Sequence, residues 1–150
     1  MISLSTGLRD ALISQYGFGT IMNFGVIRVF GGARPASSDA AAGSTPLAEI
    51  TTEGRVFVPE TDPNGAGISL QVVSPGAVTH EGVLRINGSG TGFATWWRWS
   101  WLGADDLDYS LYAPRVDGDA GIELFLRSYN ITPATDEEVG RFVFSLPERG

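Results

Sequence analysis

The sequence offers few side chains for covalent or acid–base chemistry. It has one histidine, His80, and no cysteine. A Ser-His-Asp triad would have to use His80, and no Gly-x-Ser-x-Gly elbow accompanies it. Residues 78–82 read as a turn, where a histidine is usually solvated. We therefore expect no catalytic role for His80, and the absence of cysteine excludes disulfides and thiolate chemistry.

Acidic residues gather in two glycine- and aspartate-rich stretches of the C-terminal half. Paired carboxylates can hydrolyse glycosides, but Asp in such turns normally bonds its own backbone. The segment 117–121, Asp-Gly-Asp-Ala-Gly, has some likeness to a calcium loop and lacks the spacing and closing Glu of an EF-hand. The sequence therefore predicts neither a metal site nor a cofactor. The carboxylates considered are Asp105, Asp106, Asp108, Asp117 and Asp119.

The most informative segment is aromatic, because all four tryptophans lie between positions 96 and 101. On a strand, Trp97, Trp99 and Trp101 share one face with Phe93 and Thr95, and this face is expected to fill the core. Trp96 and Arg98 then lie on the opposite face. Trp and Arg are favoured at protein interfaces, and an exposed indole can also stack on a sugar, so both kinds of contact stay open for this face.

Several short elements must position these residues. A helix is expected over about 5–15, with Ser5 or Thr6 capping its start and Gly17 and Gly19 ending it. The first strand is expected at 24–30, a run rich in β-branched and aromatic residues. It precedes a small-residue connector, 33–46, that reads as a surface loop with room for one helical turn at 39–42. Further strands are expected at 47–52, 55–58, 68–73, 83–87, 92–101, 109–115, 122–126 and 140–146.

These strands predict an all-β fold, an antiparallel sandwich or jelly-roll-like barrel with a short N-terminal helix. Residues 1–150 are expected to form a single β domain, with 1–19 as an N-terminal helix or arm. The last strand alternates clearly: Phe142, Phe144 and Leu146 should face the core, with Arg141, Val143 and Ser145 on the other side.

Charge argues against nucleic acid as a partner. The formal net charge is −7, and the ten cations are all arginine, spread from Arg9 to Arg149. Binding to phosphates needs clustered cations.

Membrane and secretion signals are not expected either. No apolar run approaches the roughly 20 residues of a membrane span, and the N-terminus does not read as a signal peptide.

Two N-terminal segments carry a resemblance to a known family. The segment 4–11 reads Leu-Ser-Thr-Gly-Leu-Arg-Asp-Ala, and 32–41 reads Gly-Ala-Arg-Pro-Ala-Ser-Ser-Asp-Ala-Ala. They resemble a "Leu-Ser-Thr-x-x-Arg-x-Ala" helix and a "Gly-x-x-Pro-x-Ser-x-Asp-x-Ala" connector found in a family of small tailed-phage structural proteins. Residues 91–98 are similar to a later segment of that family, in which a small residue and an aromatic precede Arg on a strand.

The resemblance implies a non-enzymatic protein of the virion, assembled in the host cytoplasm, with other virion proteins as partners and a homo-oligomeric or lattice-bound state. Within that class we expect a capsid decoration or cement protein. A tail, collar or baseplate component is one alternative, and a carbohydrate-binding module for host attachment is another.

The residues expected at the contacts are Arg9, Arg34, Pro35, Trp96 and Arg98. Arg98 would be costly to bury unpaired, so we expect it either at a surface or paired with a carboxylate. The acidic turn at Asp105 and Asp106 is the internal partner considered for it.

Overall fold

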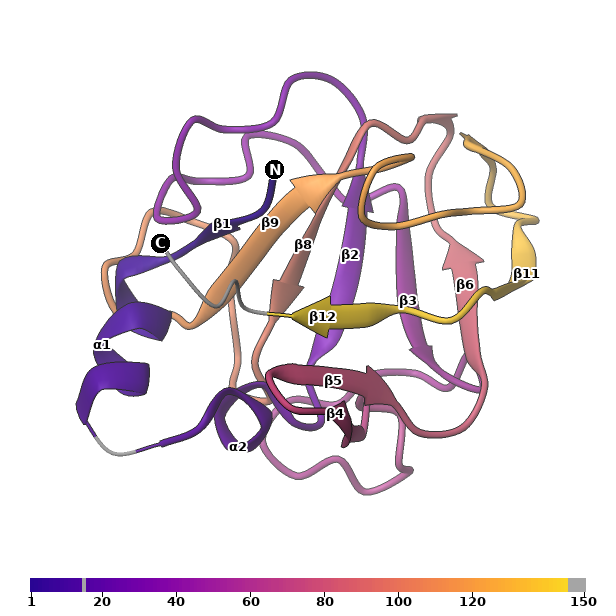
Figure 1. Ribbon diagram of the computed structural model, residues 1–150. Helices are drawn as coiled ribbons and strands as arrows, with labels where there is room; N and C mark the ends of the chain where they lie inside the picture. The colour runs from indigo at the N-terminus through magenta and orange to yellow at the C-terminus, as the bar shows by residue number, and fades with distance from the viewer. Residues whose placement is uncertain (15, 146–150) are drawn as a thin grey trace.

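Short strands make up most of the regular structure in the computed structural model, which describes residues 1–14 and 16–145 (Figure 1). Seven of them form one antiparallel sheet. Its strands, in spatial order, are β1 (Ser3–Leu4), β9 (Arg115–Asp119), β8 (Trp96–Ser100), β2 (Val26–Phe30), β3 (Ala48–Thr52), β6 (Leu84–Gly88) and β11 (Asp136–Val139).

Two smaller antiparallel sheets complete the strand pairing. One contains β12 (Val143–Ser145), β5 (Ala77–His80) and β4 (Leu70–Ser74) in that order, and the other pairs β10 (Asn130–Ile131) with β7 (Gly92–Phe93). Figure 1 shows the three-stranded sheet lying in front of the large one, with its strands running across those behind. The predicted antiparallel all-β sandwich is confirmed.

Alternation along the strands gives the large sheet one apolar face, which forms the core. A single register row across six of its strands is apolar throughout: Leu4, Val116, Trp99, Ile27, Ile50 and Ile86. Phe144 of β12 and Phe142 just before that strand pack against this face and are buried, as their alternation predicted, whereas Val143 is exposed. Leu146, the third residue of that prediction, lies outside the described residues.

Two helices cover one end of the core. α1 (Thr6–Ser14) matches the predicted helix, and the Oγ of Ser5 caps it by accepting the N–H of Leu8 at 3.2 Å. α1 ends before Gly17, as predicted, but Gly19 lies inside a second helix, α2 (Phe18–Met22), which begins directly after Gly17. Phe18 and Met22, one helical turn apart, are both buried. The N-terminal segment therefore docks on its own chain.

The predicted strand at 109–115 is wrong, because the strand there is β9, at Arg115–Asp119. Asp117 and Gly118 look like a turn in the sequence but lie inside this strand. The glycine serves close packing instead: a Cβ at Gly118 would lie 2.3 Å from the indole of Trp97. No larger residue fits this position without displacing that ring.

Other predicted elements also differ from the structure. Residues 55–58 and 122–126 form no strand, and the run 92–101 is divided into β7 and β8 at Ala94 and Thr95. β5 and β11 were not expected. The connector 33–46 is a loop, as predicted, and it contains no helix; nevertheless Ser38 and Ala42 within it are buried.

Candidate functional site

A row of polar residues in one register crosses the other face of the large sheet. Each residue is the direct cross-strand neighbour of the next, from one edge strand to the other: Ser3, Asp117, Arg98, Arg28, Glu49, Asn87 and Asp136. Cross-strand neighbours on one face lie close enough for their side chains to pair. The row therefore places charged side chains of both signs within reach of one another. The connector, residues 33–46, covers the part of the row around Arg98.

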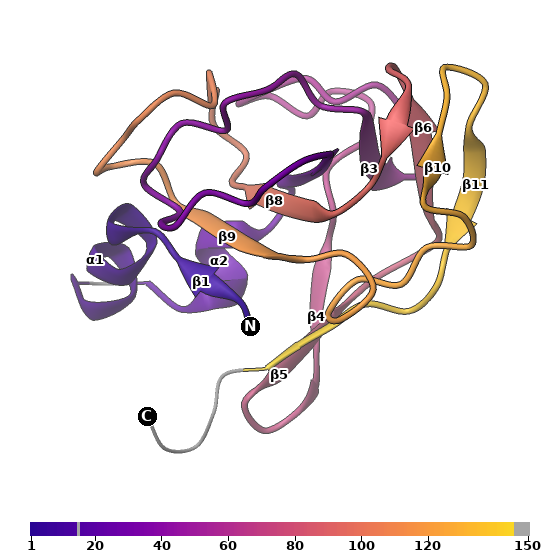
Figure 2. The ribbon, with the colours of Figure 1, turned by 90° about the horizontal axis from the view of Figure 1, so that it is seen from above.

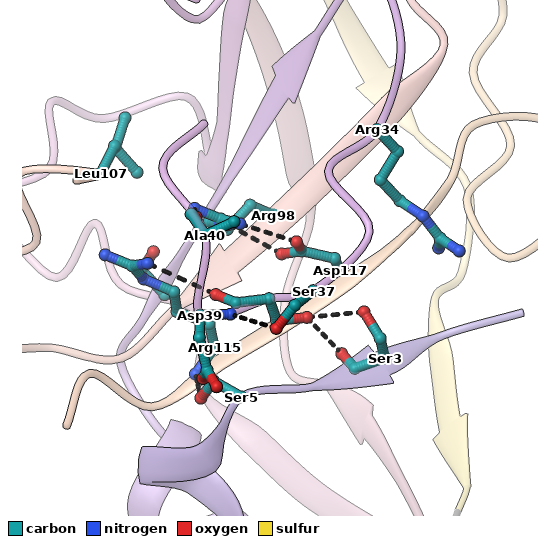
Figure 3. A network of polar contacts seen from close by, with 12 residues as sticks. Ser3, Ser5, Arg34, Ser37, Asp39, Ala40, Arg98, Leu107, Arg115 and Asp117 are labelled. Carbon is teal, nitrogen blue, oxygen red and sulfur yellow. Dashed lines mark hydrogen bonds and ion pairs between the residues drawn. The ribbon is translucent and has the colours of Figure 1, made fainter. Parts of the chain in front are cut away.

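Arg98, on β8, is the third residue of this row and is fully buried (Figure 3). Its Nε and Nη2 donate to the two carboxylate oxygens of Asp117, at 2.8 Å each, and Nη1 donates to the carbonyl of Ala40 at 3.0 Å. A two-pronged contact of this kind is the strongest form of arginine–carboxylate pairing. The expected surface position of Arg98 is wrong. The internal alternative holds, with Asp117 as the partner.

Trp96 is also buried, with 1% of its surface exposed. Its ring stacks on Phe30 with centroids 4.3 Å apart, and the guanidinium of Arg98 lies 5.5 Å from its centroid. Ala42 and Leu107 complete this small cluster. The surface position expected for Trp96 is therefore wrong, because the connector and a second loop cover that face, and the indole offers no platform to a sugar.

A second buried ion pair holds the loop between β8 and β9. Arg115 donates from Nε and Nη2 to the carboxylate of Asp105, at 2.8 and 2.6 Å, and its Nη2 also reaches the carbonyl of Asp108 at 2.8 Å. Both side chains of the pair are excluded from solvent. The acidic turn thus pairs with an arginine, as considered, but with Arg115 instead of Arg98.

The environment of Asp105 shifts its acidity. Removal from water acts to raise the pKa of its carboxyl, but the hydrogen bond from Arg115, the N–H of Leu107, the charge of Arg115 and the hydroxyl of Ser100 together outweigh that effect. The pKa of Asp105 consequently lies below its ordinary value of 3.8. The folded state therefore favours the charged carboxylate more than the unfolded chain does.

This shift predicts a loss of stability in acid. A lowered folded-state pKa contributes stability that is fully present above the unfolded pKa and is lost as the pH falls through the folded one. The free energy of unfolding, measured in urea at a series of pH values, should fall as the pH drops below 3.8. Asp105→Asn should show a weaker dependence there. An unchanged pH profile in that variant would contradict the role of Asp105.

The connector is tied to the N-terminal segment by short hydrogen bonds (Figure 3). The hydroxyls of Ser3 and Ser38 lie 2.6 Å apart. The carboxylate of Asp39 accepts from both the backbone N–H and the hydroxyl of Thr6, each at 2.6 Å. Because the first N–H groups of a helix have no partner within the helix, Asp39 acts as a second cap of α1, contributed from a distant part of the chain.

Removing this cap should have a moderate effect. We expect Asp39→Ala to lower the free energy of unfolding by about 1 kcal/mol, the usual cost of losing a helix cap. Combining it with Thr6→Val tests whether the two side chains act together, because interacting residues give non-additive losses. Losses that simply add in chemical denaturation would show that Thr6 and Asp39 act independently.

The remaining predicted contact residues lie nearer the surface. Arg9 is exposed on α1, with its Nη2 donating to the hydroxyl of Thr6 at 3.0 Å. Arg34 donates to the carbonyl of Met1 at 2.6 Å and lies 3.5 Å from Asp119, and Pro35 beside it is half-buried. Arg9 is therefore accessible, and Arg34 is bound to its own chain. Both are more exposed to solvent than Trp96 and Arg98, which are buried.

His80 lies on β5 instead of in a turn, and its Nδ1 is 2.9 Å from the carbonyl of Gly82. The segment 117–121, which has some likeness to a calcium loop, gives no metal site. The carboxylate of Asp117 at its start is paired with Arg98. Among residues 1–14 and 16–145, no three His, Asp or Glu side chains gather as metal ligands. In the same residues, no helix is long and apolar enough to cross a membrane.

Sequence reasoning missed one exposed feature, the loop 104–113, because it was assigned in part to a strand. Tyr109 and Tyr112 are 66% and 87% exposed, and Leu111 between them is also exposed. The hydroxyl of Ser110 accepts the N–H of Tyr112 at 3.1 Å, and the Arg115–Asp105 pair anchors the loop from inside. The signal in the sequence was the run of Asp and Ser residues, which form turns through their side chains.

Comparisons with known proteins add no relative. No protein-family model, no curated protein and no solved structure matches this chain.

Proposed function

We propose that the protein is a non-enzymatic structural component of a tailed-bacteriophage particle that binds other virion proteins, with capsid decoration as its role. The proposal rests on the family resemblance of the N-terminal helix and the connector. Position on the capsid, as opposed to the tail, collar or baseplate, is the finer part of the proposal, and it is tested separately below.

One observation carries the proposal: the two segments that bear the resemblance meet in space. Arg9 donates to the hydroxyl of Thr6, Thr6 donates to the carboxylate of Asp39, and the N–H of Asp39 donates to the hydroxyl of Ser37 at 3.1 Å. Each of these four residues occupies a fixed position of one of the two family patterns. Residues that are far apart in the sequence thus belong to one connected unit, which gives the spacing of both patterns a physical reason.

We place the contact with other virion proteins on the loop 104–113 and the start of α1 beside it. A Cβ at Gly7 would lie 2.2 Å from the carbonyl oxygen of Tyr112, so helix and loop are in close contact. Exposed tyrosines on a loop whose backbone is already fixed lose little entropy on binding and are favoured as interface anchors. Arg9, the predicted contact residue that remains exposed, lies on the same helix.

The experiment measures occupancy on purified particles. The double variant Tyr109→Ser with Tyr112→Ser should melt like the wild type but be lost from particles. The control is Ile122→Ser with Phe125→Ser, which changes two apolar residues of similar exposure, 62% and 65%, outside the loop. The control should keep normal occupancy. Normal occupancy of the tyrosine variant would remove this loop from the contact.

Purified capsids and purified tails, analysed separately for this chain, test whether it lies on the capsid. Recovery of the chain with capsids supports decoration, and recovery with tails, collars or baseplates replaces it with the alternative.

A further inference from the structure

Two segments that lie side by side carry no side chain that is charged at neutral pH. Apart from Tyr16, whose phenol is neutral near pH 7, residues 11–27 and 68–79 have no titratable side chain, since they contain no Asp, Glu, Lys, Arg or His. Together with the turn after β8 they line an open groove of about 830 Å³ between α2 and the β4–β5 hairpin. Among the described residues lining it, Glu60 alone is charged. We call this surface the neutral face, and its large apolar residues are Ile21, Phe24, Leu70, Val72, Val78, Trp101 and Leu102.

The hairpin beside the groove has an open edge. β4 is the last strand of its sheet, and Figure 2 shows the hairpin reaching away from the large sheet. Its exposed side chains include Val72, at 76% exposure, and Val73. Asn23 covers only the start of the strand, where its Oδ1 accepts the N–H of Leu70 at 2.9 Å.

One edge of the large sheet, in contrast, is strongly charged. Its last strand, β11, carries Asp136, Glu137 and Glu138 in succession. Charged side chains on an edge strand prevent pairing with other chains. β4 has no such protection between Leu70 and Ser74. The β11 edge of the large sheet is therefore blocked by carboxylates, whereas the β4 edge of the three-stranded sheet carries no charge.

We infer that the neutral face binds a second copy of this chain, in a two-fold contact that brings the two β4–β5 hairpins together. Each copy has a net charge of −7, so two copies repel wherever their carboxylates approach. The neutral face lets apolar surfaces meet while most carboxylates remain in water. A different partner of opposite charge would gain more from the acidic parts of the surface. A two-fold axis places the same patch on both sides.

The test is the mass of the free protein by sedimentation equilibrium. The wild type should reach the mass of two chains as its concentration rises. Val72→Asp should raise the dissociation constant of the dimer by roughly tenfold or more, because a carboxylate buried without a partner is costly. Val143→Asp is the matched control, an exposed valine on β12 at the opposite edge of the same small sheet. It should leave the dissociation constant unchanged.

Gln71→Glu gives a second variant with almost the same shape, at a position that is exposed in the single chain. It should also weaken the dimer while leaving the circular dichroism spectrum and the melting temperature unchanged. A wild type that stays monomeric at every concentration would overturn the inference. So would a Gln71→Glu variant that associates as tightly as the wild type.

Salt gives an independent reading of the same contact. Added salt screens the repulsion between two acidic copies, so the wild-type dimer should become tighter as ionic strength rises. A dimer that weakens in salt would indicate a contact made by charges and would contradict the neutral face. Because these measurements use the free protein, their outcome is separate from that of the particle experiments.

Discussion

Replacing Asp117 by alanine should lower the free energy of unfolding by about 3–5 kcal/mol, the usual cost of breaking a buried ion pair from one side. Both side chains of the Arg98–Asp117 pair are fully excluded from solvent. The variant leaves the guanidinium of Arg98 buried, and the carbonyl of Ala40 is then the one acceptor that remains to it among the described residues. A buried charge without its counter-ion is what makes such a substitution costly. Chemical denaturation of the purified variant measures the loss.

Two controls separate this explanation from a general sensitivity of the sheet. Asp136→Ala removes an ion pair with Arg85 on the exposed edge strand β11, and exposed pairs contribute only about 0–1 kcal/mol. Replacing both partners, as Arg98→Met with Asp117→Leu, should recover much of the loss, because no charge is then left unpaired. If Asp117→Ala unfolds like Asp136→Ala, the buried pair does not hold the sheet as described.

The second large effect is expected at Trp99. Trp99→Ala should cost about 3–5 kcal/mol through lost burial and the cavity left behind. Its ring makes edge contacts with Phe18, Phe142 and Phe144, at centroid distances of 5.5, 5.7 and 6.2 Å. Phe18 belongs to α2, Phe144 to β12, and Phe142 directly precedes β12. The tryptophan on β8 therefore joins the large sheet to both α2 and the three-stranded sheet.

Trp101→Ala is the matched control for Trp99→Ala. Both tryptophans fall on the same face by strand alternation, but β8 ends at Ser100 and Trp101 is 39% exposed. Its replacement should therefore cost much less in the same denaturation experiment. Equal losses for the two variants would show that Trp101, as the sequence predicted, belongs to the core with Trp97 and Trp99.

The sequence predicted best where structure depends on local alternation. The inward positions of Trp97, Trp99, Phe142 and Phe144 follow from a period of two residues along a strand, and the structure confirms them. The same alternation was wrong for Phe93 and Trp101, which are exposed, because Phe93 lies on the separate strand β7 and β8 ends before Trp101. The cap at Ser5 is local in the same sense, since it involves residues three apart. In these cases neighbouring residues contain all the information that the inference needs.

The prediction failed where a distant part of the chain decides exposure. Trp96 and Arg98 alternate away from the core and looked exposed, but residues from the connector and from the loop around Leu107 cover them. Nothing near positions 96–98 indicates that cover. The need of Arg98 for a carboxylate followed from its chemistry, whereas the identity of Asp117 followed only from the register of β8 against β9.

The misplacement of β9 has a related cause. Asp117-Gly118 is a common turn pair, so its residues argued for a loop. In the structure the aspartate is the counter-ion of Arg98, and the glycine makes room for Trp97. Each residue type was read through its usual local role, and the actual roles involve partners about 20 positions away. The loop 104–113 and its exposed tyrosines were missed through the same error.

The central claim, that this chain is a structural part of a phage particle, is tested most directly by quantitative mass spectrometry of purified particles. We predict that the chain is present in many copies per particle, in a fixed ratio to the other structural proteins, and that the ratio persists through repeated purification. Its absence from purified particles, while it is abundant in the lysate from which they came, would contradict the claim.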